Sequence, residues 1–163
     1  MQIRPLASAD YEVISPVVDE WWGGRAVRHL VPRLFFEHFS STSFVLVEAG
    51  ELVGFLIGFR SQSQPHVAYI HFVGVAPSRR SKGHGRLLYS AFFERVAALG
   101  CTEVNCITSP VNIGSIAFHQ SMGFSIVCTG AEQGGIPVSL NHAGEGQHRV
   151  LFRKLLASEN NGT

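Results

Sequence analysis

Charged residues are scarce in this chain of 163 residues, since they make up 15% of it, whereas an average globular domain has about 25%. Lysine and arginine together number 13, and aspartate and glutamate together number 12. The resulting net charge of +1 provides no general attraction for nucleic acid or for an acidic membrane. An anion that binds here must therefore be held by a local concentration of positive charge.

Long apolar segments and a disulfide framework are also missing. The longest nearly uninterrupted apolar run covers 67–77, which is far shorter than the roughly 20 residues that span a bilayer, and the N-terminus lacks the apolar core of a secretory signal. Cysteine is limited to Cys101, Cys106 and Cys128, an odd number in a chain that can bury a core without disulfides. We therefore expect a cytoplasmic protein without a membrane partner, whose cysteines are buried thiols.

Metal-binding and nucleotide-binding motifs are absent as well. The 8 histidines are scattered, with no His-Glu-x-x-His and no paired Cys-His spacing, so we expect no metal site. No Gly-Lys-Ser or Gly-Lys-Thr occurs, which excludes a nucleoside-triphosphate loop. Leu88 stands where a dinucleotide fingerprint needs its last glycine.

What the chain does have is ample apolar material, because 45% of its residues are hydrophobic. We predict a single domain over 1–156, followed by a disordered tail over 157–163. Strands and helices are expected in alternation, which predicts an α/β fold with a mixed sheet. The predicted strands cover 2–4, 43–47, 52–59, 67–75, 103–108, 124–128 and 149–155. Helices are predicted from the N-cap Ser8 to about Glu20 with a split at Pro16, from Pro32, from 86 to 99, and from Asn112 to Ser121. The glycine-rich stretch 129–147 is predicted to be a long mobile loop.

One short stretch concentrates the positive charge. Residues 79–86 contain four basic side chains and no acidic one, together with two glycines that let a ligand approach the backbone closely. The helix expected next directs its unpaired N–H groups and positive dipole end at the same place. The basic residues are Arg79, Arg80, Lys82 and Arg86, and the glycines are Gly83 and Gly85. This combination predicts a phosphate site.

This loop and a later motif resemble those of the GNAT superfamily of N-acetyltransferases. The family's Arg/Gln-x-x-Gly-x-Gly/Ala loop is matched by Arg80-Ser81-Lys82-Gly83-His84-Gly85, after Val75-Ala76-Pro77. The family's second signature is matched by Asn112, Ser115, Ile116, Phe118 and Met122-Gly123-Phe124. The order of elements fits over almost the whole chain. The resemblance implies the GNAT fold, a twisted mixed sheet flanked by helices whose central strands separate to admit acetyl-CoA.

Acetyl-CoA is therefore the implied acetyl donor. The pyrophosphate is expected on backbone amides of the loop, with its basic side chains adding attraction; this set comprises Arg80, Ser81, Lys82, Gly83, His84, Gly85 and Arg86. The backbone of Val73 and Val75 is expected to pair with the pantetheine arm as an added strand, with one amide near them stabilising the thioester oxygen. Gly74 is consistent with a bulge there. Asn112 is expected to bind the pantetheine near Ser115, and it can equally be the N-cap of its helix.

Two histidines are candidates for proton transfer. An ammonium group must lose a proton for its nitrogen to attack the thioester, and histidine, with a reference pKa of about 6.5, is the natural base. His71 lies on the strand that leads to the cofactor, where alternation puts it on one face with Tyr69, Val73 and Val75. It resembles histidines of some arylalkylamine acetyltransferases, and a hydrogen-bonded core histidine is the alternative. His119 stands where family members often have the tyrosine that protonates the CoA sulfur, so it is the candidate acid, with a structural helix histidine as the alternative.

The acceptor in this family usually lies between the first two helices and the sheet. That region offers Trp21, Trp22 and Phe36, with Tyr69 on the strand, and aromatic walls of this kind suit an apolar or aromatic amine, although the same residues can equally form core. We expect an enzyme that moves an acetyl group from acetyl-CoA to the primary amine of a small molecule by direct attack in a ternary complex. The alternatives are a catalytically silent CoA-binding sensor or interaction module and a protein N-terminal acetyltransferase. A homodimer fits the apolar composition.

Overall fold

A sheet of seven strands runs through the computed structural model, which describes residues 1–157. Its order is β1-β2-β3-β4-β5-β9-β6. The strands are β1 (Gln2–Pro5), β2 (Phe44–Glu48), β3 (Glu51–Arg60), β4 (Val67–Val75), β5 (Glu103–Thr108), β6 (Ser125–Ile126) and β9 (Val150–Leu155). The pair β4–β5 is parallel and the other neighbours are antiparallel. The mixed sheet and the α/β class are therefore as predicted.

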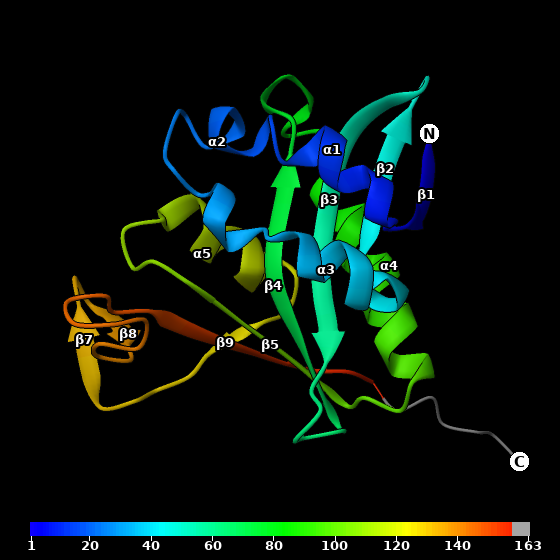
Figure 1. Cartoon of the computed structure of the whole chain (residues 1–163). Coiled ribbons are helices and arrows are strands. Elements are labelled where there is room, and N and C mark those ends of the chain that lie inside the picture. The colour runs from blue at the N-terminus through cyan, green and yellow to red at the C-terminus, as the bar shows by residue number, and fades with distance from the viewer. Residues whose placement is uncertain (158–163) are drawn as a thin grey trace, which may run out of the picture.

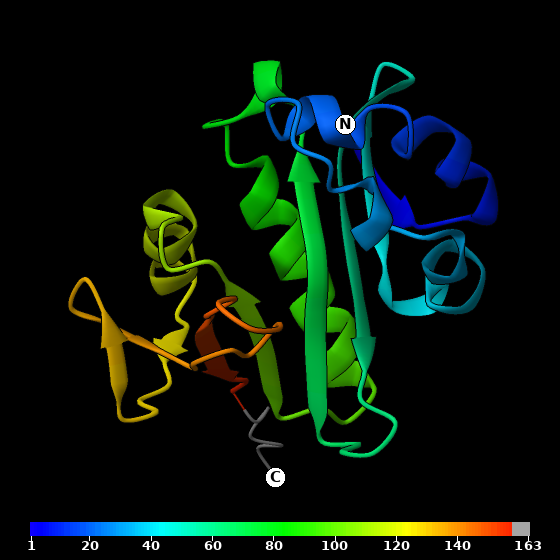
Figure 2. The same ribbon diagram turned by 60° about the vertical axis from the view of Figure 1, so that its left-hand side comes forward.

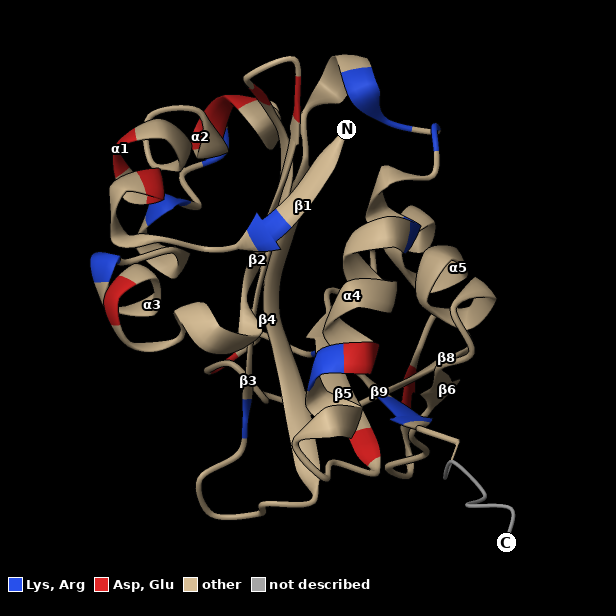
Figure 3. Ribbon diagram, turned by 90° about the vertical axis from the view of Figure 1, so that its right-hand side faces the viewer, with Lys and Arg blue, Asp and Glu red and all other residues tan. Residues whose placement is uncertain are grey.

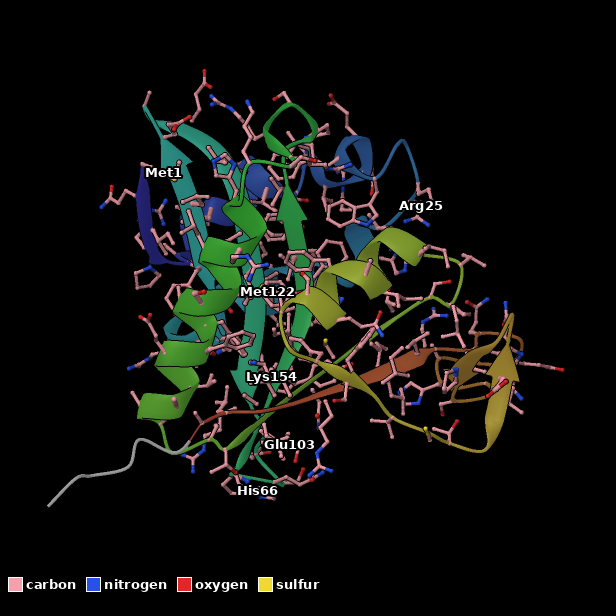
Figure 4. All side chains as sticks on the ribbon, turned by 180° about the vertical axis from the view of Figure 1, so that it is seen from behind. Met1, Arg25, His66, Glu103, Met122 and Lys154 are labelled. Carbon is pink, nitrogen blue, oxygen red and sulfur yellow. The ribbon has the colours of Figure 1, made fainter. Side chains whose placement is uncertain are left out.

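Helices cover both faces of this sheet (Figure 1; edge-on in Figure 3). One face carries α1 (Tyr11–Ile14), α2 (Val18–Trp21) and α3 (Arg33–His38), and the other carries α4 (His84–Ala98) and α5 (Ile113–Ser121), seen from behind in Figure 4. Each layer of helices packs on the sheet through its own apolar core. Phe36 and Phe55 belong to the first core, and Leu88 and Phe92 belong to the second. No helix within residues 1–157 is both long enough and apolar enough to cross a bilayer.

The first helical segment differs from the prediction at its start. Pro16 splits it as expected, because α1 ends at Ile14 and α2 begins at Val18. Ser8, however, is not an N-cap: it is the first residue of a 3-10 turn that extends to Asp10. The Asp10 carboxylate accepts the Ala7 N–H at 2.7 Å and also pairs with Arg4. The capping oxygen therefore comes from the third residue of the turn.

The stretch predicted as a long loop contains a hairpin, so the prediction of a loop is wrong over 131–138. Strands β7 (Ala131–Gln133) and β8 (Ile136–Val138) pair antiparallel. Gly134 and Gly135 join them with φ values of 57° and 77°, the left-handed conformation that a tight two-residue hairpin turn requires. Val138 is buried and anchors the hairpin to the core.

Two smaller predictions concern the cysteines and the tail. Cys101 and Cys106 are buried as expected, whereas Cys128 is exposed because it follows the short strand β6. The predicted disordered tail lies, apart from Ala157, outside the described residues. No group of three metal-ligating side chains occurs among residues 1–157.

Gly58 is the position in the core with the least room. A Cβ atom there would lie 2.4 Å from Cε2 of Phe92 on α4. We expect Gly58→Ala to lower the free energy of unfolding by about 1–3 kcal/mol, because overpacking shifts the helix from the sheet. Urea denaturation measures this, with Gly114→Ala as the control, since a Cβ at Gly114 meets nothing within 4 Å. Equal urea midpoints for the two variants would contradict the packing described.

Candidate active site

The two central strands separate halfway along their length. Strands β4 and β5 pair only where Val67–Tyr69 face Glu103–Asn105. Beyond this point β4 continues to Val75 and β5 to Thr108 without pairing to each other (Figures 1 and 2). The second half of β4 therefore has one edge that no strand of the described chain covers.

The backbone of Val73 and Val75 faces this open edge. The Ala76 N–H donates to the Val53 carbonyl of the β3 segment at 2.9 Å, and Gly74 faces β3 in the same way, because backbone groups alternate sides along an antiparallel strand. The backbone N–H and C=O groups of Val73 and Val75 therefore point away from β3, toward the open edge. In agreement, the Val75 carbonyl accepts a hydrogen bond from Nε of Arg80 at 3.1 Å and not from β3.

A β-bulge at His71 changes which side chains share a face. Gly58 pairs with Ile70 and Ile57 with Phe72, which leaves His71 as the extra residue of β4. Alternation is therefore interrupted, and the prediction that His71 shares a face with Val73 and Val75 is wrong. His71 stacks on Phe35 of α3 with ring centroids 4.5 Å apart, whereas the two valines pack toward α4.

Gly74 is not the bulge residue, which corrects the prediction. It pairs in register with Phe55. A Cβ at Gly74 would lie 2.7 Å from the Phe55 ring and 3.0 Å from the Trp22 ring. The glycine is thus required by two aromatic rings that lie directly on the strand.

His71 is held by the segment that precedes α3. Its Nε2 lies 2.6 Å from the Leu30 carbonyl oxygen. Because a carbonyl only accepts, Nε2 carries the hydrogen and donates it, which leaves the lone pair on Nδ1. A neutral His71 in this tautomer can accept a proton at Nδ1.

The basic loop between β4 and α4 uses two of its arginines to hold the protein together. Arg79 pairs with Glu48 on β2, and its Nη2 lies 3.6 Å from Glu51 on β3. Arg80 donates to the carbonyls of Val75 and Trp21. Figure 3 shows the positive charge of this loop in blue at the N-terminal end of α4.

The remaining basic residues of the loop, Lys82 and Arg86, form no ion pair or side-chain hydrogen bond within residues 1–157. Ser81 and Gly83 both have positive φ values, 61° and 82°, which curl the loop around the start of α4. His84 is buried, and its Nδ1 bonds the Arg79 carbonyl at 2.9 Å. Two positive charges are therefore available to an anion beside the N-terminus of a helix.

The N-terminus of α5 lies across the separation from this loop. The Asn112 side-chain oxygen accepts the Ser115 N–H at 3.2 Å, so Asn112 is the N-cap. Gly85 at the start of α4 faces Phe118 of α5, whose ring would lie 3.4 Å from a Cβ at Gly85. Helices α4 and α5 thus approach each other closely beside the loop.

His119 is buried and bonded at both ring nitrogens. Nδ1 donates to the Ser115 carbonyl at 2.7 Å, and Nε2 accepts the Tyr89 hydroxyl at 2.8 Å. The ring also stacks on Phe152 at 4.6 Å. Burial lowers the pKa of His119 below its ordinary value and raises that of Tyr89 well above its own. Both groups are therefore neutral at pH 7, and the geometry favours the structural alternative for His119.

This burial predicts a pH-dependent stability. An unfolded chain protonates a histidine below about pH 6.5, whereas the folded protein keeps His119 neutral to lower pH. Stability is therefore full above that value and falls as the pH drops toward the lowered pKa. We expect the urea midpoint to decrease from pH 7.5 to 5.5 by less in His119→Phe than in the unmodified protein. Exposed His142, as His142→Gln, is the control, and an equal pH response in all three proteins would refute the assignment.

The aromatic residues predicted for the acceptor fall into two groups. Trp21 and Phe36 are buried, with Trp21 against Phe55 and Phe36 against Tyr11, so these two rings form core and present no surface to an acceptor. Trp22 is half-buried and lies 4.7 Å from the ring of Phe72.

Phe72 and Asn105 were missed by sequence reasoning. Phe72 reaches the face of Trp22 only because the bulge shifts it there. Asn105 pairs with Tyr69 at the last point of contact between β4 and β5. Its Nδ2 donates to Glu103 at 2.9 Å, and its buried Oδ1 has no hydrogen-bond partner within the described residues. No local pattern marks either residue.

Comparison with known proteins agrees with this arrangement. The model of the Acetyltransferase (GNAT) family matches residues 5–124. The L-2,4-diaminobutyric acid acetyltransferase of Nocardia farcinica is 34% identical over 89 residues, which are 55% of this chain and 46% of that protein. The chain thus spans about half the length of the curated relatives that it matches first.

Solved structures share the fold over the whole chain. A diaminobutyrate acetyltransferase of Paenibacillus lautus, in complex with L-2,4-diaminobutyric acid and coenzyme A, has a TM-score of 0.72 at 19% identity and covers 99% of this chain and 98% of its own. A putative acetyltransferase of Salmonella typhimurium with acetyl-CoA has a TM-score of 0.71 at 20% identity and covers 100% and 98%. At these identities the likeness concerns the fold.

Proposed function

Because this chain belongs to the Acetyltransferase (GNAT) family, we propose that it transfers an acetyl group from acetyl-CoA to the primary amine of a small molecule. The observation that carries the proposal is the separation of β4 from β5 beyond Tyr69, beside a basic loop at the start of α4. The uncovered backbone of Val73 and Val75 offers an edge to an extended pantetheine arm. The positive charges of Lys82 and Arg86 can attract the phosphates of CoA.

The transfer is a direct displacement. The neutral amine nitrogen attacks the thioester carbonyl carbon, the C–N bond forms and the C–S bond breaks. The nitrogen loses one proton, and the CoA thiolate takes one proton from water. Nδ1 of His71 receives the proton from the amine. An amide of Val73 or Val75 donates to the thioester oxygen as negative charge develops on it. His119 and Tyr89 are neutral and bonded to each other, so we assign them to the support of α5.

The acceptor is proposed to be a small amine that carries further polar groups. Relatives at 32–34% identity over about half of this chain are diaminobutyric acid acetyltransferases. Trp22, Phe72 and Tyr69 supply apolar walls. A homodimer and the absence of a nucleic-acid partner stay predictions.

The test is CoA-thiol release by the purified protein with acetyl-CoA and separate amines. The panel contains L-2,4-diaminobutyrate, an arylalkylamine, a polyamine, an aminoglycoside and a short peptide with a free N-terminus. We expect turnover with a small amine. Turnover with the peptide alone would assign a protein N-terminal acetyltransferase. Tight acetyl-CoA binding without any turnover would assign a CoA-binding module.

A further inference from the structure

Arg80 belongs to the basic loop by sequence, but its side chain leaves the loop. Nε donates to the carbonyl of Val75, the last residue of β4, at 3.1 Å. Nη2 donates to the carbonyl of Trp21, the last residue of α2. The two carbonyls come from the end of β4 and the end of α2, and one planar guanidinium joins them.

The carbonyl of Trp21 belongs to the peptide group that links Trp21 to Trp22. Because a peptide group is planar, a hydrogen bond to its oxygen restricts the rotations on both sides of it. The Trp21 ring is fixed separately in the core against Phe55. With the Trp21 ring and the Trp21 carbonyl both held, the peptide group that leads into Trp22 is restricted in orientation.

The other hydrogen bonds of the chain around Trp22 are local, because the N–H groups of Trp22, Gly23 and Gly24 donate to carbonyls within 18–20. Helix α2 has 4 residues, and Gly23 and Gly24, both at positive φ, follow Trp22 directly. Trp22 itself touches β4 through Phe72, at 4.7 Å between ring centroids, and through the space left by Gly74. Arg80 is therefore the one side chain of the basic loop that sets the position of this ring.

We propose that Arg80 is a positioning residue for the amine acceptor, acting through the Trp21 carbonyl on Trp22. This inference rests on the proposed function, because Trp22 is taken there as a wall of the acceptor site. The Nη1 group of Arg80 forms no hydrogen bond within residues 1–157, so a phosphate can bind it without displacing the two carbonyls. Binding of the cofactor and order in the acceptor wall are therefore coupled through one side chain.

Lys82 provides a matched control, since it carries the same charge in the same loop without a contact to α2. At saturating acetyl-CoA we expect Arg80→Ala to raise the KM for L-2,4-diaminobutyrate about tenfold, which corresponds to one lost hydrogen bond of about 1.4 kcal/mol. Lys82→Ala should raise the KM for acetyl-CoA and leave the acceptor KM unchanged. Arg80→Lys keeps the charge but has a single nitrogen, so it should restore acetyl-CoA binding without restoring the acceptor KM.

A second readout does not depend on turnover. In a Trp21→Phe background the remaining fluorescence comes from Trp22, because the chain has 2 tryptophans. We expect acrylamide to quench Trp22 about twofold more strongly after Arg80→Ala or Arg80→Lys, since the ring becomes more exposed. After Lys82→Ala, quenching should equal that of the Trp21→Phe protein with an unmodified loop.

The outcomes separate the two proposals. Unchanged quenching and an unchanged acceptor KM in both Arg80 variants would overturn the positioning role while leaving the proposed function intact. Absence of turnover in the unmodified protein with every amine would overturn the proposed function, and stronger quenching in the same preparation would still establish the link from Arg80 to Trp22. If Arg80→Ala does not fold, Arg80→Lys decides both readouts.

Discussion

Replacing Lys82 and Arg86 together by alanine is expected to weaken acetyl-CoA binding by about a hundredfold, with kcat at saturating acetyl-CoA changed little. Both other arginines of the loop are bonded to protein groups, Arg80 with only its Nη1 left over, so Lys82 and Arg86 are the two whose whole charged groups are available to the phosphates. A hydrogen bond to a charged group contributes about 1.5–3 kcal/mol, and two at the lower end correspond to more than a hundredfold in affinity. Isothermal titration calorimetry with acetyl-CoA measures the effect.

The control for this experiment removes two positive charges elsewhere. Arg95 lies near the end of α4 and Lys154 lies on β9, where it packs over Phe93. The double variant Arg95→Ala with Lys154→Ala should bind acetyl-CoA as the unmodified protein does at 0.15 M salt, where the Debye length is about 8 Å. An equal loss in both double variants would mean that net charge, and not the loop, attracts the cofactor.

His71→Gln is expected to lower kcat by about a hundredfold or more, the usual range for loss of a general base. The glutamine amide nitrogen can take the place of Nε2 and keep the bond to the Leu30 carbonyl, so the segment before α3 should stay in position. What the substitution removes is the Nδ1 lone pair. Because the walls of the site are retained, the KM values for acetyl-CoA and for the amine should change by less than kcat.

Single-turnover measurements with L-2,4-diaminobutyrate separate this chemical step from product release. Exposed His38, as His38→Gln, is the control and should retain full activity. Partial recovery of His71→Gln by added imidazole would support proton transfer at Nδ1. Retention of more than half of kcat by His71→Gln would show that His71 is a structural residue of the bulge and that another group takes the proton.

Features that depend on neighbouring residues could be predicted without the structure. Strand β4 has the predicted bounds 67–75, Pro16 interrupts the first helix, and Asn112 caps α5. The basic glycine loop is contiguous, so its place before a helix could be predicted, although α4 begins at His84, two residues earlier than expected. These features follow from local backbone preferences, which act over a few residues.

Features that join distant segments became visible only in the folded chain. The bulge at His71 arises from the register of β4 against β3, and it reverses the face on which the next side chains lie. Arg79 meets Glu48 at a separation of 31 positions along the chain, Arg80 meets Trp21 at 59, and Tyr89 meets His119 at 30. Local sequence cannot specify them, because each depends on which surfaces meet when the helices pack on the sheet.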